Sequence, residues 1–345
     1  MITTAQLRTK RPIVLNQSAI KTFINCKRLY AWEYFQNLQP VGRRSVLAIG
    51  TAAHAGLAVF HSGGIKAPEP LPAAATADQK AEHSALTRIA TLPPVEQAQT
   101  IARLTLRKEA GAVSTFEDKS VEEAQDILDR VFPAYVEYWK KYDALWKPLN
   151  QEIQFLVRVG DDSFNIWLRG RADNLSVAKG GLYLVDYKTA GRMDPRDLLK
   201  YEMDFQLSAY IYGLTKHLTE QSLKEGGEPV YIRGAIIDVL VKTQTPQFAR
   251  ELYTRSDQEL QEFEDEFIEV ASDIRARQER VAAGEDWKIV FHRNTEHCFR
   301  YGTCAFRDVC QSDTPTRRAL YDAREPNYVD KSQQELLKAW EKENA

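Results

Sequence analysis

Two aspartates and a lysine within residues 168–188 carry the clearest chemical signal in this sequence. Asp173 lies at the end of one strand-like run, and Asp186 and Lys188 lie in the next, beyond a turn at 179–181. Residues two apart on a strand share a face, so Asp186 and Lys188 point the same way. If the turn folds the strands together, both carboxylates reach one cation. This set suits Mg²⁺ or Mn²⁺ acting on a phosphate.

Such a cation would polarise a phosphoryl oxygen, help to ionise a water molecule and stabilise the leaving oxygen. Lys188 could then orient the water or neutralise the developing charge. The alternative is that Asp173 is a turn residue and that Asp186 and Lys188 form an ordinary pair on a strand. Charges inside the apolar run LYLVDYKTA are unusual without a partner or a metal, which weighs against that alternative.

Three further polar residues gain meaning only from their positions. Gln206 and Tyr210 are four apart and so lie on one face of an expected helix, where they could fix a phosphate or a base edge. His54 lies in GTAAHAGL, within an expected helix over 46–60. A lone helical histidine is usually a packed or surface residue, so His54 matters only in company.

The chain has four cysteines, at Cys26, Cys298, Cys304 and Cys310. A cytosolic chain rarely uses cysteines for disulfides. Four thiolates are the usual set for a [4Fe-4S] cluster or a tetrahedral Zn²⁺ ion, and free buried cysteines are the plain alternative. A shared metal would tie the first helix to the end of the chain, so that binding free energy becomes folding free energy. We expect a structural site without a redox step.

The composition limits the class of protein. With 345 residues, 43% of them hydrophobic and 27% charged, the chain can form a soluble globular protein of one or two domains. No apolar run approaches the roughly 20 residues of a membrane span, and the start lacks a signal-peptide core. We therefore expect a cytoplasmic protein without a membrane partner. The net charge of −2 gives no general attraction to nucleic acid, so DNA binding would need a local basic groove.

The N-terminal half is expected to be mostly helical. After an edge strand at Ile13 to Leu15, Ser18 is a plausible N-cap for a helix to about Phe35. A long helical stretch should be kinked or split at Pro133, because proline lacks the helical donor. Between these, a helical insertion over the active face could contact a DNA backbone. The expected helices are 46–60, 76–91, 95–112 and 121–146, and the candidate contacts are Arg103, Arg107 and Lys108.

The C-terminal half alternates strands and helices, which predicts an α/β fold with a mixed sheet flanked by helices. The expected strands are 152–159, 163–177, 181–187, 230–241 and 247–254, and the expected helices are 204–217 and 257–282. Residues 311–345 should form a polar tail with one short helix at most. The resulting segments are 1–60 (N-terminal helices), 61–146 (helical insertion), 147–295 (catalytic core), 296–311 (cysteine loop) and 312–345 (tail).

The order of these motifs resembles the PD-(D/E)XK nucleases, and among them the RecB-like branch. In that branch a helix histidine precedes G-x-x-D, then D-x-K on the next strand, then Q-x-x-x-Y on the next helix. The matching pieces are His54, Gly170 to Asp173, Asp186 to Lys188, and Gln206 to Tyr210. Ala172 stands where the family name has a proline. The resemblance spans about 18 to 310.

The resemblance implies a restriction-endonuclease-like fold and a role for each motif. His54, Asp173, Asp186 and the Tyr187 carbonyl would bind Mg²⁺ or Mn²⁺, and Lys188 would be catalytic. The Gln206 and Tyr210 side chains would bind substrate.

The cysteines are similar to those of AddB-type and CRISPR-associated RecB-like nucleases, where one N-terminal and three C-terminal cysteines bind a [4Fe-4S] cluster. The common spacing there includes C-x2-C, whereas Cys298, Cys304 and Cys310 are separated by two gaps of five residues. His297 could replace a thiolate.

The implied activity is a metal-dependent DNA exonuclease on single strands or DNA ends, because a walled channel admits a flexible strand more readily than a duplex. No G-x-x-x-x-G-K-S/T loop occurs, so unwinding would need a helicase partner. Two alternatives are a non-cleaving DNA-binding adaptor of a helicase–nuclease or CRISPR adaptation complex, and a redox iron–sulfur protein. The redox protein would have no need of Asp186 and Lys188. Polarity, exo- or endonuclease mode, metal count, pathway and oligomeric state stay open.

Overall fold

A mixed sheet lies at the centre of this computed structural model, which describes residues 11–41, 45–72, 74–111, 118–143, 145–161, 164–300, 302–324 and a few between 335 and 342. In these residues the strand order is β1-β4-β5-β6-β7, with β3 paired to the other edge of β4. The strands are β1 (Ile13–Leu15), β3 (Lys147–Val159), β4 (Ile166–Ala178), β5 (Gly181–Ala190), β6 (Ile232–Val241) and β7 (Gln247–Tyr253).

Strand β4 organises this sheet. Its first residues, 166–168, pair in parallel with β1, and its last residues, 174–178, pair antiparallel with β5. Both partners lie along the same edge of β4, while β3 runs along the other. Asp173 is the last residue before the β5 pairing begins, in the stretch of β4 that lies between its pairings with β1 and with β5.

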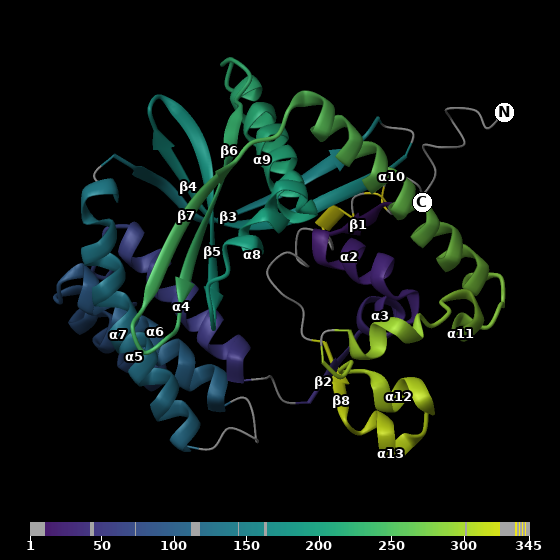
Figure 1. Cartoon of the computed structure of the whole chain (residues 1–345), viewed down its shortest axis with the longest axis horizontal. Helices are drawn as coiled ribbons and strands as arrows, with labels where there is room; N and C mark the ends of the chain where they lie inside the picture. The colour runs from purple at the N-terminus through teal and green to yellow at the C-terminus, as the bar shows by residue number, and fades with distance from the viewer. Residues whose placement is uncertain are drawn as a thin grey trace.

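Long helices cover both faces of the sheet (Figure 1). They are α2 (Gln17–Asn25), α4 (Ser45–His61), α5 (Ala77–Ala90), α6 (Pro94–Gly111), α7 (Asp118–Asp143), α9 (Phe205–Lys224) and α10 (Asp257–Ala282). Shorter pieces are α3 (Lys27–Tyr30), η1 (Ala31–Phe35), α8 (Pro195–Leu199), η2 (Lys200–Met203), α11 (Trp287–Val290), η3 (Thr295–Phe299), α12 (Arg307–Gln311) and α13 (Pro315–Arg318). This arrangement confirms the expected mixed sheet flanked by helices.

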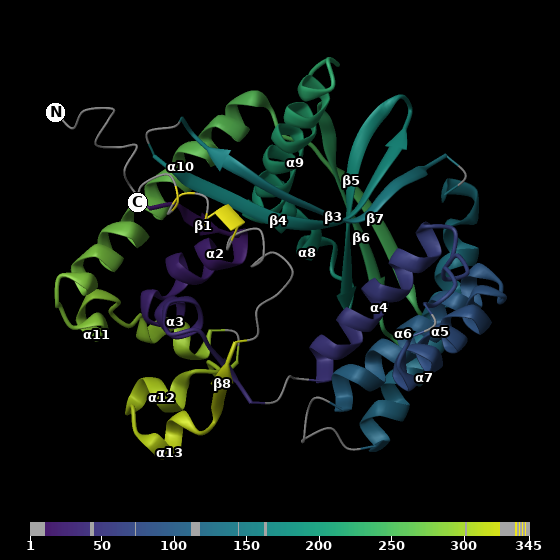
Figure 2. The same cartoon turned by 180° about the vertical axis from the view of Figure 1, so that it is seen from behind.

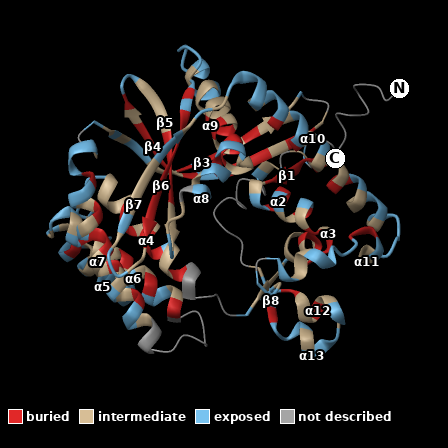
Figure 3. Ribbon diagram, viewed as in Figure 1, coloured by how far each residue is buried: buried red, intermediate tan, exposed pale blue. Residues whose placement is uncertain are grey.

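Each face of the sheet has its own apolar core (Figure 3). On one face, α2, α9 and α10 bury residues such as Phe155, Leu168 and Phe267. On the other, α4, α6 and α7 bury residues such as Leu57 and Phe132. The central strands of the sheet are therefore packed against helices on both faces. In the described residues, no helix is long and apolar enough to cross a bilayer.

Two N-terminal expectations need correction. The first helix is capped by Asn16, whose side chain accepts from the Ala19 N–H at 2.8 Å, and Ser18 lies inside the helix. That helix also ends at Asn25, because Cys26 has an extended backbone, with φ −158° and ψ 109°. The chain then turns into α3 and the π-helix η1. The helix expected to reach Phe35 is thus broken at the cysteine.

Helix α7 is not split at Pro133. It continues from Asp118 to Asp143. Proline removes one helical hydrogen bond, but the neighbouring Phe132 and Tyr135 are fully buried in the second core. Tertiary packing therefore holds the helix together where local propensity alone predicts a break.

The start of the expected polar tail contains ordered structure. Strand β8 (Tyr321–Ala323) pairs antiparallel with β2 (Leu38–Pro40), and α13 precedes it. The Tyr321 ring stacks on Phe306 at 5.1 Å. A three-residue strand has no signal of its own, since its hydrogen-bond partner lies far away in the sequence. Figures 1 and 2 show these segments as a small lobe with α12, beside α3 and away from α5–α7.

A glycine lets α9 approach the sheet closely, so Gly213→Val should destabilise the protein. A Cβ at Gly213 would overlap the buried ring of Phe155. Overpacking of this kind costs about 1–3 kcal/mol, and urea unfolding should show a loss of that size. Gly191→Val is the control, because a Cβ there meets nothing within 4 Å. Equal stability of the two variants would contradict the close packing of α9.

Candidate active site

A tight hairpin brings the two aspartates together. Between β4 and β5, Lys179 and Gly180 both have positive φ, at 47° and 73°, as a type I′ turn requires. The strand pairing then begins at Asn174 and Val185, so Asp173 and Asp186 lie at adjoining positions on neighbouring strands. The expected hairpin is therefore present, and it places both carboxylates where the pairing of β4 with β5 ends.

Asp173 is held from two directions. Its Oδ2 accepts from the backbone N–H of Tyr187 at 2.9 Å, a bond across the hairpin. The same oxygen lies 3.4 Å from His54 Nδ1. His54 comes from α4, which packs on β3, β4 and β5. The structure thus brings His54, separated from Asp173 by more than a hundred residues, into direct contact with it.

Asp186, Lys188 and Gln206 form a second group. Lys188 Nζ lies 2.5 Å from Asp186 Oδ2, and the Gln206 amide donates to Asp186 Oδ1 at 3.0 Å. Gln206 Oε1 also accepts from Lys188 at 3.5 Å. Asp204 caps α9 by accepting from the Gln206 N–H at 2.7 Å, which fixes the first turn of the helix. Gln206 therefore contacts both charged groups of β5.

Tyr210 lies one turn further along α9. Its ring packs edge-on against Phe155, with centroids 6.1 Å apart, and it belongs to the border of the first core. Gln206 contacts the charged groups directly, and the Tyr210 ring lies one turn away at the border of the first core.

The charged groups in this site shift one another's pKa values. Burial opposes ionisation of Asp173, but the hydrogen bond and charge of His54 and the Tyr187 N–H together lower the pKa of Asp173. Burial raises the pKa of Asp186 to about 6, although Lys188 opposes the shift. Burial disfavours the charged form of His54 and of Lys188, yet Asp173 raises the pKa of His54 and Asp186 raises that of Lys188. Opposite charges at close range thus stabilise each ionised form.

The donor set has the chemistry of a site for a hard divalent cation. Two carboxylates and an imidazole are its side-chain donors, and the peptide of Tyr187 lies between them. Asp186 Oδ2 is buried and makes no well-aligned hydrogen bond, although Lys188 pairs with it. In the part of the chain that the structure describes, no three such side chains are already gathered at metal-binding spacing. A bound cation would therefore have to displace Lys188 from Asp186.

Glu152 is a neighbour that the sequence analysis missed. It lies on β3 opposite Asp173, has φ 54°, and pairs with Arg171 at 2.8 Å. Burial raises the pKa of Glu152, with Arg171 opposing and the charge of Asp173 adding to the shift. Nothing in the sequence singles out Glu152, because an acidic residue at the start of a strand is usually exposed to solvent.

The four cysteines line one cavity of about 200 Å³. Cys26 reaches it from the break between α2 and α3, and the other three from the loop around η3 and α12. The Asn294 N–H donates to Cys26 Sγ at 3.4 Å. Burial raises the pKa of Cys304 and of Cys310, and the positive charge of Arg28 opposes the shift at Cys310. The structure thus brings all four thiols to one place.

Sequence comparison matches the PD-(D/E)XK nuclease superfamily over residues 14–311. Among solved structures, a protein of Eubacterium rectale assigned as an exonuclease is 14% identical, with a TM-score of 0.43 over 95% of this chain and 94% of that chain. The protein SSO0001 is 13% identical, with a TM-score of 0.27 over 58% of this chain and 79% of that one. Comparison with the curated proteins gives no match.

The contact between His54 and Asp173 predicts a pH-dependent contribution to stability. Because Asp173 raises the pKa of His54 above the roughly 6.5 of a free histidine, this contribution is complete below that pH. It is lost as the pH rises through the folded-state pKa. Without metal, wild type should therefore exceed His54→Gln in unfolding free energy more at about pH 6 than at about pH 9. Urea titrations in EDTA that give a constant difference would contradict this.

Proposed function

We propose, from the premise that this chain belongs to the PD-(D/E)XK nuclease superfamily, that it is a metal-dependent DNA exonuclease acting on single strands or DNA ends. The observation that carries the proposal is the contact network of His54, Asp173, Asp186, Lys188 and Gln206. These side chains come from two strands, β4 and β5, and two helices, α4 and α9, that the fold brings to one point. The superfamily match supports a nuclease. The contact network supplies the residues that we propose for catalysis and metal binding.

His54, Asp173, Asp186 and the Tyr187 carbonyl would hold Mg²⁺ or Mn²⁺. When bound, the cation would polarise a phosphoryl oxygen and help to ionise water. Lys188 then has two roles. Beside Asp186 it neutralises a buried carboxylate, and once displaced it would orient the attacking water or neutralise charge on the phosphate. Gln206 can hold the lysine in either position, because its amide touches both residues.

A preference for single strands or ends is supported by the walls of the site. Helix α4 closes one side with His54, and α9 closes the other with Gln206. Helix α2 is tied to this second wall by Lys21, 3.2 Å from Asp204. A site enclosed on two sides admits a flexible strand more easily than a duplex. We place this activity in the cytoplasm, with unwinding left to a partner such as a helicase, recombination protein or CRISPR protein.

The cysteine cavity is proposed to hold a [4Fe-4S] cluster as a structural staple. A zinc ion would draw four sulfurs to about 2.3 Å from one point. The thiols line a cavity of about 200 Å³ together with aromatic and basic side chains, and this cavity leaves room for a group larger than one ion. Arg28 and Arg293 place positive charge beside Cys310, as an anionic cluster would need. Such a cluster would join α3 to the C-terminal lobe, and Zn²⁺ is the alternative occupant.

A non-cleaving DNA-binding adaptor is the second candidate. It is favoured by the closed ion pair of Lys188 and Asp186, and by the lack of a preassembled metal group in the described residues. The nuclease proposal requires that this pair opens when metal and DNA bind.

Lys188→Ala should lower the rate of metal-dependent cleavage by about 10²- to 10⁴-fold, because the variant loses the group proposed to serve the water. The measurement is hydrolysis of end-labelled single-stranded DNA in Mn²⁺, with EDTA as the blank. Lys80→Ala, an exposed change on α5, is the matched control. Product ladders from each labelled end give the polarity. No cutting by wild type would favour the adaptor, and cutting that survives loss of Lys188 would contradict its role.

The purified protein should be brown and contain about four iron atoms per chain. Cys298→Ser should lose iron and unfold at a lower temperature, since cluster binding adds to folding free energy. Asp186→Asn should keep its iron, which separates the two sites. Zinc in place of iron would select the zinc alternative, and a protein free of both metals that folds normally would refute the staple.

A further inference from the structure

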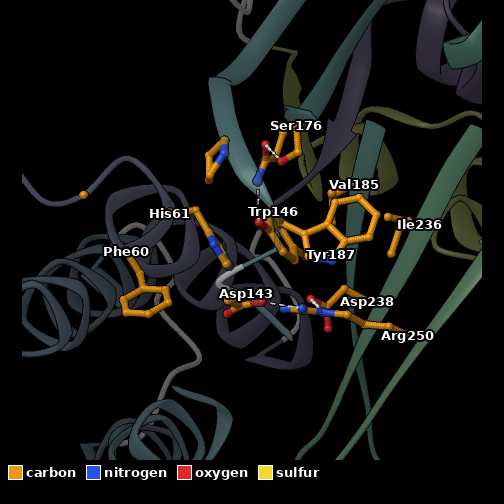
Figure 4. A pocket seen from close by; sticks show the side chains of 13 residues that line it. Phe60, His61, Asp143, Trp146, Ser176, Val185, Tyr187, Ile236, Asp238 and Arg250 are labelled. Carbon is orange, nitrogen blue, oxygen red and sulfur yellow. Dashed lines mark hydrogen bonds and ion pairs between the residues drawn. The ribbon is translucent and has the colours of Figure 1, made fainter. Parts of the chain in front are cut away.

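A second cavity lies on the other face of the catalytic strands. It has a volume of about 190 Å³, more than ten times the roughly 15 Å³ that one water molecule needs. Its walls come from the end of α4, the end of α7 and strands β4 to β7 (Figure 4). Gly63, which is exposed, marks the side open to solvent.

One buried oxygen in this cavity has no partner. Asp238 on β6 is completely buried, and its Oδ2 accepts from the Tyr135 hydroxyl at 2.6 Å and from Arg250 Nε at 2.7 Å. The other oxygen, Oδ1, is buried and makes no hydrogen bond. Because an unpaired buried acceptor is costly, a ligand that donates a hydrogen bond to it would bind favourably.

The charge of the lining selects the kind of donor. Two carboxylates, Asp143 and Asp238, face a single guanidinium, that of Arg250, which pairs with both. The ring of His61 is buried beside them, and burial lowers its pKa to about 3, so it is neutral. The cavity thus contains two acidic side chains and one guanidinium that is already paired with both, and it disfavours a phosphate. A neutral ligand with N–H donors fits it.

The remaining walls are aromatic and apolar. The Tyr187 ring stacks on His61, with centroids 5.6 Å apart and planes within 10°. Trp146, Val185 and Ile236 complete the sides, and Figure 4 labels Trp146 and Tyr187 among the side chains that line the cavity. Flat apolar walls with a few polar groups are typical of sites for planar ligands.

The cavity adjoins the candidate active site. Asn174 follows Asp173 on β4, and its amide donates to the Tyr187 hydroxyl at 3.0 Å. Tyr187 itself separates Asp186 from Lys188, and its N–H bonds to Asp173. The same two strands therefore present carboxylates to the candidate metal site and ring and amide groups to the cavity.

We propose that this cavity binds a nucleobase with an exocyclic amino group, from the DNA strand that is held at the active site. The inference rests on the proposed nuclease function. The amino group would donate to Asp238 Oδ1, and the ring would lie among Trp146, Tyr187 and His61. Cytosine fulfils these requirements, whereas uracil has a carbonyl in place of the amino group and would meet the carboxylate with an acceptor.

The test compares deoxycytidine and deoxyuridine oligonucleotides of equal length, which differ mainly in that group. Binding to the full chain is measured in EDTA by fluorescence anisotropy, so that no cutting occurs. Wild type should bind the deoxycytidine strand about tenfold more tightly. Ser176→Leu, which fills the cavity beside Asn174, should reduce the preference to less than twofold. Asp265→Asn, on the outer side of α10, is the control and should keep it.

Asp238→Asn gives a second check, because an amide can donate to the uracil carbonyl and should shift the preference toward deoxyuridine. If that variant does not fold, Ser176→Leu decides alone. Equal affinity of wild type for both strands, or a preference that survives Ser176→Leu, would overturn the proposal and leave the cavity to water. Cleavage in Mn²⁺ is scored separately. Cleavage without a base preference would contradict only the base-binding proposal. A base preference without cleavage would contradict only the proposed nuclease activity.

Discussion

The hydrogen bond from the Tyr187 N–H to Asp173 joins the parts on which this site depends. It crosses the hairpin just before β4 begins to pair with β5, five residues after the pairing of β4 with β1 ends. Without a strand on that edge, Asp173 is free to turn toward His54. The same bond fixes the peptide between Asp186 and Lys188. One local break in the sheet therefore sets the direction of both carboxylates.

Buried charges of this kind must be compensated, and the compensation here is mutual. Asp173 is paired with His54, and Asp186 with Lys188 and Gln206. A buried carboxylate without such partners would be protonated instead. A divalent cation at the proposed site would compete with Lys188 for Asp186. The electrostatic order of the site is thus tied to the metal that it is proposed to bind.

The C-terminal lobe connects the ends of the described chain. Strand β8 pairs with β2, and Arg28 donates to the carbonyl of Phe291 at 2.8 Å from within the buried region. These contacts join residues more than two hundred positions apart, and the cysteine cavity lies among them. Closing so long a loop costs conformational entropy, which a shared metal group would offset.

The sequence by itself determined the fold class and the local chemistry. The turn at 179–181 and the apolar run around Asp186 predicted the hairpin, and helical spacing put Gln206 and Tyr210 on one face of a helix. These features depend on neighbours within a few residues, so they can be predicted from the local sequence. Only the tertiary structure decided the break at Cys26, the unbroken helix at Pro133, the β2–β8 pair and the approach of Glu152 to Asp173. Asp238 is the clearest case, because its immediate neighbours on β6 are apolar and its partners, Tyr135 and Arg250, come from α7 and β7. Burial and pairing across such distances depend on how whole helices and strands pack together, and no local sequence pattern encodes that packing.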